Sequence, residues 1–295
     1  MNNTERILLV VNPVSGGTDK TKLIDTVSAE AKSRGMLLEI YETSCDNNEQ
    51  KIKDLVRNNP PDRVLVAGGD GTIQLMSKIF QGTDTPIGIL PAGSANGFAV
   101  SLDIPDTLEG QLSIALGDNL VEIDILEING HICIHLADMG VNAELIKNYE
   151  QGKIRGKLGY ALQSIQSLIS ADFPYTFNVE ANGKQYEQTG IMMAIANANK
   201  FGTGAMINPH GKINDGKFEV IIFKNFDLDG IIKTLNGQLT PDMEFVDIIS
   251  TDHVIVTTTT EVPLQVDGEF IGDTQKTEAK ISDYKVWLAL PVSAT

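Results

Sequence analysis

The sequence predicts an α/β protein: an N-terminal, three-layer domain built on a parallel sheet, plus a C-terminal domain of the antiparallel β-sandwich type. Over residues 1–120, short apolar runs alternate with helical patterns, which is typical of a parallel sheet wrapped by helices. Over residues 121–295, the pattern changes to period-two segments joined by turn residues, which is typical of antiparallel strands. We therefore expect a domain boundary near residue 120.

The N-terminal elements follow from apolar spacing and from residues that end helices. Apolar runs predict four strands, at Ile7–Asn12, Met36–Glu42, Arg63–Ala67 and Ile87–Leu90. Apolar residues at helical spacing predict helices between them, over 19–34, Lys51–Asn59, the segment that starts at Ile73, Phe98–Leu102 and Leu108–Leu116. Gly35 ends the first of these helices, and Pro60-Pro61 ends the second.

The C-terminal half is predicted to consist mainly of strands. Antiparallel period-two segments are expected at Val121–Ile125 and at Glu127–Leu136, the second around the turn signal Asn129-Gly130. Further strands are predicted at Tyr175–Glu180, Gln185–Ala196, Lys217–Phe223, His253–Thr258, Pro263–Val266 and Lys285–Leu290. Helices are expected near 156–170 and 227–236.

Composition narrows the classes of function. The chain has 39 acidic and 23 basic side chains among 295 residues, and the formal net charge of -16 argues against broad nucleic-acid binding. The two cysteines, Cys45 and Cys133, give no disulfide framework, which fits a reducing cytoplasm. The apolar run Ile7–Val11 is too short for the core of a signal peptide, and no run reaches the length of a transmembrane segment. We therefore expect a cytoplasmic protein.

The segment Gly68-Gly69-Asp70-Gly71-Thr72 lies between an apolar strand and a helical pattern. Glycines at such a junction let backbone N–H groups approach a phosphate, and we expect Gly71 to need a positive φ. A carboxylate beside a phosphate is repulsive unless a divalent cation lies between them, so Asp70 indicates a metal-nucleotide complex. An ordinary strand-to-helix turn is the alternative for this motif alone.

Two more loops rich in small residues are expected at the same edge of the sheet. They are Asn12–Gly17, with Lys20 and Lys22 close behind it, and Pro91–Gly97. Because the carboxyl ends of parallel strands lie along one edge, the three loops should open on the same crevice and form a nucleotide phosphate site. The glycine spacing of P-loop NTPases and that of Rossmann dehydrogenases are both missing from the sequence.

These motifs resemble the three nucleotide loops of the diacylglycerol kinase catalytic family, which includes bacterial lipid kinases and the sphingosine and ceramide kinases. The matching segments are Asn12-Pro13-Val14-Ser15-Gly16-Gly17, Gly68–Thr72 and Leu90–Asn96. Two later segments, Asn214–Val220 and Gln265–Glu269, resemble the Asp-Gly-x-Leu-x-Val and Asp-Gly-Glu segments of the same family. The resemblance covers nearly the whole chain.

The resemblance implies an ATP-dependent transferase of phospholipid biosynthesis, in which a lipid hydroxyl attacks the γ-phosphate. It implies that Glu269 accepts the hydroxyl proton, with Asp267 beside it, and that Asp70 helps to hold the catalytic Mg²⁺. A hairpin turn is the alternative for Asp267-Gly268-Glu269. The implied nucleotide-binding residues are Asn12, Pro13, Ser15, Gly16, Thr43, Gly68, Gly69, Asp70, Gly71, Thr72, Gly93, Ser94 and Asn96.

The resemblance also implies a structural Mg²⁺ bound by Asp215 and by the backbone carbonyls of Lys212 and Lys217. Oxygen donors from one tight loop suit this ion, and a turn that precedes the strand Lys217–Phe223 is the alternative. The implied partner is a lipid at the membrane surface, so peripheral association with the inner membrane face is left open, as is a homodimer. The basic residues from Lys147 to Lys157 are expected to be a solvated face, with lipid headgroups as the alternative.

Two other functions are left open. An NAD kinase shares the Gly-Gly-Asp-Gly turn and the two-domain plan, although Asp267-Gly268-Glu269 favours the lipid kinase. A binding protein that has lost turnover is suggested by Gly97 and Val100, which stand where many family members have aspartate and arginine. Gln74-Leu75 likewise stand where Asn-Glu is usual.

Overall fold

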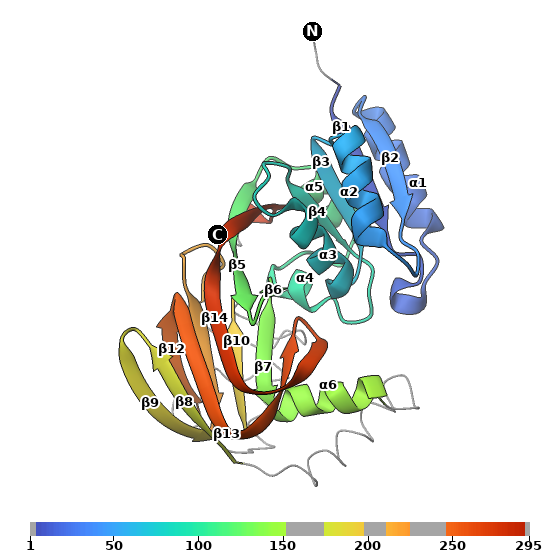
Figure 1. Ribbon diagram of the computed structural model, residues 1–295. Coiled ribbons are helices and arrows are strands. Elements are labelled where there is room, and N and C mark those ends of the chain that lie inside the picture. Colours follow the sequence, from blue (N-terminus) through green and yellow to red (C-terminus); the bar gives the residue numbers. More distant parts are fainter. Residues whose placement is uncertain (1–3, 152–173, 198–210, 225–245, 293–295) are drawn as a thin grey trace. The chain divides into compact units, whose positions relative to one another are not determined.

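A computed structural model describes residues 4–151, 174–197, 211–224 and 246–292 of the chain. The chain divides into two compact units, residues 1–123 together with 284–295, and residues 124–283 (Figure 1). The C-terminal residues thus return to the first unit, which the predicted division at residue 120 did not include. In the described part of the chain, no helix has the length and apolarity that crossing a membrane requires.

The first unit is built on a parallel sheet, as expected. Its strands run in the order β2-β1-β3-β4, and the end of β14 pairs with β4 through Leu288 and Ile87. Every pairing in this sheet is parallel. The bounds are β1 (Arg6–Val11), β2 (Leu37–Glu42), β3 (Arg63–Gly68), β4 (Ile87–Pro91) and β14 (Glu269–Ala289).

Helices cover both faces of this sheet. The helices are α1 (Thr21–Ser33), α2 (Asn48–Asn58), α3 (Asp70–Phe80), α4 (Gly97–Ser101) and α5 (Leu108–Ala115). One face packs Leu9 and Leu65 against Val27 of α1 and Leu112 of α5. Figure 1 shows α2 and α3 on the other face. Burial of both faces explains why β1 and β3 read as continuous apolar runs in the sequence.

The second unit is antiparallel. Its strands run in the order β12-β11-β10-β7-β13-β14, β8 pairs with β13 and with β9, and β5 pairs with β6 and with β14. A helix, α6 (Val141–Gln151), follows β7. The remaining bounds are β5 (Leu120–Ile128), β6 (His131–Cys133), β7 (Leu136–Gly140), β8 (Tyr175–Ala181), β9 (Lys184–Gly190), β10 (Met192–Ala196), β11 (Phe218–Phe223), β12 (Val246–Thr251) and β13 (His253–Val266).

The strands of the second unit alternate in burial, as period-two segments should. Phe177 and Val179 of β8 are buried, and the residues between and after them, Asn178 and Glu180, are exposed. The buried side chains of β8, β10, β11 and β13 form one apolar cluster, which includes Phe177, Val179, Met193, Ile195, Phe218, Val220, Val254 and Val256.

The predicted strands differ from the structure at several places; for example, Glu127–Leu136 is divided among β5, β6 and β7, and most of β14 was not predicted. Gln185–Ala196 is two strands, because the chain bends at Ile191, whose N–H donates to the carbonyl oxygen of Phe223 at 2.8 Å. The segments predicted at 253–258 and 263–266 are one strand, β13, whose pairing with β14 shifts in register between Thr257 and Val262. β12 was not predicted. The helices predicted near 156–170 and 227–236 lie outside the described residues.

We predict that shortening a side chain destabilises the protein far more on the central strand β3, which is buried on both faces, than at an exposed position of the edge strand β2. Leu65 is 0% exposed on β3, and Leu37 is 58% exposed on β2. Leu65→Ala should lower the free energy of unfolding by about 2–5 kcal/mol, because it leaves a cavity. Leu37→Ala should change it by less than about 0.5 kcal/mol. Urea denaturation of both variants measures this, and similar losses in the two would contradict the assigned burial.

Candidate active site

The loops expected at one edge of the parallel sheet do lie there. They follow β1, β3 and β4, and these strands are neighbours in the order β1-β3-β4. From β1 the chain goes to β2 on one side, whereas β3 and β4 lie on its other side. The loops after β1 and β3 therefore flank the point where the strand order reverses, which is where open α/β sheets bind ligands.

The three loops touch through backbone atoms. A Cβ on Gly16 would lie 2.7 Å from the carbonyl oxygen of Ala92, and a Cβ on Gly93 would lie 2.5 Å from the Cα of Gly69. Gly16 also has a φ of 64°, which other residues rarely adopt. The contact between Gly69 and Gly93 is close from both sides, since a Cβ on Gly69 would lie 3.2 Å from the Cα of Gly93. These glycines are therefore required by the contact between loops, before any ligand is considered.

Side chains hold the loops together as well. Lys20 is 6% exposed, and its Nζ donates to the carbonyl oxygens of Ser15 (2.7 Å) and Ala92 (3.0 Å) and to the hydroxyl of Thr18 (2.7 Å). Burial lowers the pKa of this ammonium group. Asn12 Nδ2 donates to Thr72 Oγ1 at 3.3 Å, which joins the first and second loops. A cation near the first loop was expected, but its buried position was not.

Asp70 has a different set of contacts from those that the sequence predicted. Its two carboxylate oxygens accept hydrogen bonds from the backbone N–H groups of Gly97 and Phe98, both at 2.9 Å. These are the first residues of α4, so Asp70 fixes the third loop against the start of α3. Asn96 completes the third loop, because its Oδ1 accepts from the N–H of Gly93 at 2.7 Å. The Mg²⁺-binding role of Asp70 stays a prediction.

Gly71 does not have the positive φ that we expected, since it lies in the first turn of α3. A Cβ there would meet no atom within 4 Å, and the residue is exposed. Of the described glycines with such open surroundings, the others have positive φ. Neither the fold nor the backbone conformation therefore requires glycine at this position.

The other residues predicted to bind nucleotide lie at or near the same edge. Pro13 and Ser94 are exposed, Ser15 is half-buried, and Thr43 follows β2 with its N–H donating to the carbonyl oxygen of Val11 at 2.8 Å. A Cβ on Gly68 would overlap the side chain of Thr72, so this glycine makes room within its own loop.

In the second unit, the Asp267-Gly268-Glu269 segment is a hairpin turn between β13 and β14. Asp267 and Gly268 have φ values of 49° and 89°, and Val266 pairs with Glu269 across the turn. Two central residues with positive φ are what tight hairpins need, and Asp-Gly supplies them readily. Glu269 is exposed at the start of β14. The turn geometry is compatible with both interpretations of this segment.

The carboxylate of Asp267 binds the protein backbone. It accepts from the N–H groups of Ile134 (2.9 Å), His135 (3.0 Å) and Leu136 (3.0 Å), and Cys133 Sγ lies 3.4 Å away. Burial raises the pKa of Asp267, and these N–H donors oppose the rise. Asp267 thus attaches the turn to the start of β7, and its catalytic role stays a prediction.

Two residues that the sequence analysis did not single out hold the same turn. Gln265 Oε1 accepts from the N–H of Gly268 at 2.7 Å, and Gln265 Nε2 donates to Asp138 Oδ2 at 2.5 Å. Asp138 is fully buried on β7, and burial raises its pKa to about 6. The available signal was an aspartate within the otherwise apolar run Leu136–Gly140.

The loop predicted to bind structural Mg²⁺ is held by another buried carboxylate. Asp124 Oδ2 accepts from the N–H of Gly216 at 2.7 Å, and the N–H of Asp124 donates to the carbonyl oxygen of Ile213 at 2.7 Å. Asp215 is exposed, and one of its oxygens accepts from the N–H of Lys217 at 3.1 Å. Among the residues that the structure describes, no group of three or more His, Cys, Asp or Glu side chains could hold a metal ion.

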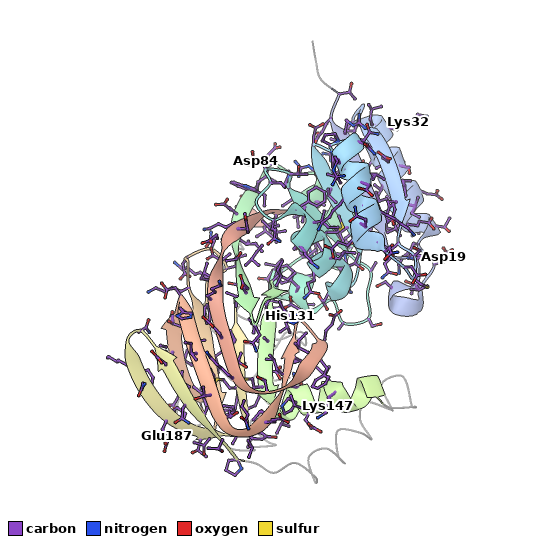
Figure 2. All side chains as sticks on the ribbon, in the orientation of Figure 1. Asp19, Lys32, Asp84, His131, Lys147 and Glu187 are labelled. Atoms are coloured by element: carbon purple, nitrogen blue, oxygen red, sulfur yellow. The ribbon has the colours of Figure 1, made fainter. Side chains whose placement is uncertain are left out.

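One member of the basic segment has protein partners. Lys147 Nζ lies 2.8 Å from Asp273 Oδ2 and 5.4 Å from the centre of the Phe270 ring (Figure 2 labels Lys147). This side chain joins α6 to the first residues of β14, so it is not a free cation for lipid headgroups. Lys153, Arg155 and Lys157 lie outside the described residues.

Comparison with known proteins identifies both parts of the chain. Residues 6–128 match the diacylglycerol kinase catalytic domain, and residues 136–283 match the YegS C-terminal NAD kinase beta sandwich-like domain. The "Probable lipid kinase YegS" of Escherichia coli O1:K1 is 29% identical over 271 residues, which cover 89% of this chain and 88% of that protein. The "Probable lipid kinase YegS-like" of Citrobacter koseri is 30% identical over 228 residues, 75% of each chain.

Solved structures share the fold at lower identity. A diacylglycerol kinase from Bacillus anthracis strain Sterne is 17% identical, with a TM-score of 0.75 and full coverage of both chains. An NAD kinase from Archaeoglobus fulgidus in complex with ATP is 12% identical, with a TM-score of 0.58, and the match covers 98% of this chain and 95% of that one. The chain therefore belongs to the diacylglycerol kinase catalytic family and is a kinase of its YegS-like lipid kinase group.

Proposed function

We propose that the protein transfers the γ-phosphate of ATP to a hydroxyl group of a lipid of the diacylglycerol type. The observation that carries this proposal is the contact between three glycine-bearing loops at the carboxyl edge of the parallel sheet. Membership of a lipid kinase family supports the reaction class.

In this proposal the phosphates of ATP lie on the loops 12–17, 68–72 and 91–97. Backbone N–H groups and the first turn of α3 supply hydrogen-bond donors and a positive dipole end. Lys20 adds a buried positive charge beneath two of the loops. The open space at Gly71 gives room for a ligand where the protein itself does not need a glycine.

Glu269 is the proposed proton acceptor. The lipid hydroxyl oxygen forms a bond to the γ-phosphorus, the bond from that phosphorus to the β–γ bridging oxygen breaks, and ADP leaves. The hydroxyl proton goes to the carboxylate of Glu269. Most of the acceleration in phosphoryl transfer comes from alignment and charge neutralisation, so a base on a well-held turn contributes both proton acceptance and position. Asp267 and Gln265 hold that turn.

The structural Mg²⁺ is proposed at Asp215. The carboxylate oxygens of this exposed side chain and the backbone carbonyl oxygens of Lys212 and Lys217 come from one short loop. Oxygen is the ligand atom that Mg²⁺ prefers. The loop is attached to Asp124 through Gly216, so the donors come from a fixed segment. When bound, the ion would stabilise this loop and take no part in transfer.

The lipid acceptor requires contact with a membrane surface. Val14 and Val100 are 82% and 38% exposed, and both lie in or beside the loops of the first unit. The net charge of -16 makes general attraction to anionic lipid unfavourable, so we propose local, apolar contact. A homodimer stays a prediction.

The proposed reaction is tested by incubating the protein with γ-labelled ATP, Mg²⁺ and mixed micelles of one lipid at a time. The panel contains diacylglycerol, phosphatidylglycerol, ceramide and sphingosine, with NAD as a water-soluble acceptor. Label in a lipid product supports the proposal. Label in NADP alone would replace it with an NAD kinase activity, and no transfer to any acceptor would favour a binding protein.

We predict that Gly71→Ala weakens ATP binding although it does not damage the fold. Alanine is the better helix former by up to about 1 kcal/mol, and its Cβ meets open space, so the melting temperature should hold or rise. Gly71→Val should weaken ATP binding further because its side chain is larger. Calorimetry measures the affinity for ATP, and thermal melts give the melting temperature. Unchanged ATP affinity in the two folded variants would contradict the placement of the phosphates beside Gly71.

We predict that Mg²⁺ raises the melting temperature of the wild-type protein and that Asp215→Ala abolishes most of this rise. A cation that binds only the folded state stabilises it by mass action. Asp252→Ala, which removes another exposed carboxylate of the second unit, should respond to Mg²⁺ as the wild type does. Equal responses in all three proteins would place the ion elsewhere.

We predict that Glu269→Gln lowers turnover by roughly 10²- to 10⁴-fold, the usual contribution of a general base. The amide keeps the size of the side chain but cannot take the proton, and ATP affinity should change little. Glu187→Gln on β9 (Glu187 is labelled in Figure 2) is the matched control and should keep wild-type turnover. If Glu269→Gln kept wild-type turnover under conditions where chemistry is rate-limiting, another group would be the base.

A further inference from the structure

The hairpin turn that carries Glu269 is held by a chain of hydrogen bonds that begins at a buried carboxylate. Asp138 Oδ2 accepts from Gln265 Nε2, and Gln265 Oε1 accepts from the backbone N–H of Gly268, the residue before Glu269. The orientation of the Gln265 amide is decided by its two ends, because the carboxylate only accepts and the backbone N–H only donates.

From this geometry we infer that Asp138 is a positioning residue: through Gln265 it fixes the turn from which Glu269 projects. The inference rests on the proposed role of Glu269. Asp138 does not touch the reacting groups in this account, and it acts only by holding the backbone at Gly268. Asp267 attaches the same turn from its other side, through the N–H groups of residues 134–136.

The surroundings of Asp138 are apolar or neutral. It lies opposite Gln265 of β13 and Ala194 of β10, and Asn142 of α6 donates to its Oδ2 at 2.6 Å. The backbone N–H of Ala143 is a further donor that lowers the pKa of Asp138, and the side chain is fully buried. The described charged residues of α6, Glu144 and Lys147, interact with each other and, through Lys147, with Asp273.

A carboxylate in such a place costs stability, which argues that it is kept for another reason. Burial raises the pKa of Asp138 from an ordinary value of 3.8 to about 6. The folded state therefore holds this proton more tightly than the unfolded state does. The contribution of Asp138 to the free energy of unfolding therefore falls as the pH rises from about 4 to 6. Above pH 6 the group is ionised, and its full destabilising effect is present. A neutral residue would avoid that cost.

Ionisation also strengthens the hold on the turn. A hydrogen bond to a carboxylate is about twice as strong as one to a neutral carbonyl oxygen, so protonation of Asp138 should loosen Gln265 and, through it, Gly268. At pH 7.5 the chain of hydrogen bonds is complete, whereas at pH 5 its first member is weakened.

The test compares the wild type with Asp138→Asn and Gln265→Leu. Hydrogen exchange of the Gly268 amide, followed by NMR and corrected for the intrinsic pH dependence, should be protected roughly 3- to 10-fold less at pH 5 than at pH 7.5 in the wild type. In Asp138→Asn this pH dependence should be absent. In Gln265→Leu the protection should be low at both pH values.

Turnover and melting temperature give the second readout. The melting temperature of Asp138→Asn minus that of the wild type should be larger above pH 6 than at pH 4. The turnover of Asp138→Asn at pH 7.5 should nevertheless fall roughly 3- to 10-fold, with KM for ATP unchanged. A residue that only stabilised the fold would show the opposite melting behaviour. Thr277→Val, which replaces a buried and unpartnered hydroxyl on β14, is the matched control and should alter neither turnover nor Gly268 exchange.

The outcomes separate this inference from the proposed function. Gly268 protection in Gln265→Leu equal to that of the wild type would overturn the role of Asp138 even if Asp138→Asn failed to fold, and it would leave Glu269 as the proposed base. Loss of turnover in Glu269→Gln together with the expected exchange supports both. Full turnover in Glu269→Gln, with turnover lost in neither Asp138→Asn nor Gln265→Leu, would overturn both.

Discussion

The loop edge of the first unit depends on the close approach of three loops, which meet through backbone atoms at their glycines. At Gly69 and Gly93 the second and third loops are so near that a Cβ on either glycine would lie within 3.2 Å of the Cα of the other. At Gly69 and Gly93 this contact leaves no space for a side chain, so the two loops meet there through backbone atoms. Lys20, Asn12 and Asp70 then fix each loop to its neighbour. The proposed phosphate site is thus held together by contacts within the protein, which suits a reaction that depends on alignment.

In the second unit, hydrogen bonds hold the hairpin turn that carries the exposed carboxylate of Glu269. Asp267 attaches the turn to residues 134–136, and Gln265 attaches it to Asp138. Raising the pKa of Asp138 from 3.8 to about 6 corresponds to about 3 kcal/mol of lost stability when the group is ionised. A cost of this size in a buried position is typical of residues that are kept for function.

Much of the fold could be predicted from the sequence, because both units follow simple patterns. The alternation of apolar runs and helices predicted the strands from Arg6 to Pro91 to within a residue or two. The errors came from long-range pairing. The bend at Ile191 is attached to Phe223 of a distant strand, and β13 continues through a register shift in a segment that the sequence pattern predicts as a break. For the site, motif order predicted which loops meet. The sequence could not show that Asp70 and Asp267 bind backbone N–H groups, or that Asp138 binds Gln265, because these contacts join residues 27 to 134 positions apart.

A crystal structure with a non-hydrolysable ATP analogue and Mg²⁺ tests the central claim most directly. We expect the triphosphate on the loops 12–17, 68–72 and 91–97, with its oxygens accepting from backbone N–H groups and one phosphate in the open space beside Gly71. An analogue bound with its phosphates away from these three loops, at a concentration that supports turnover, would contradict the claim that the loops form the nucleotide site.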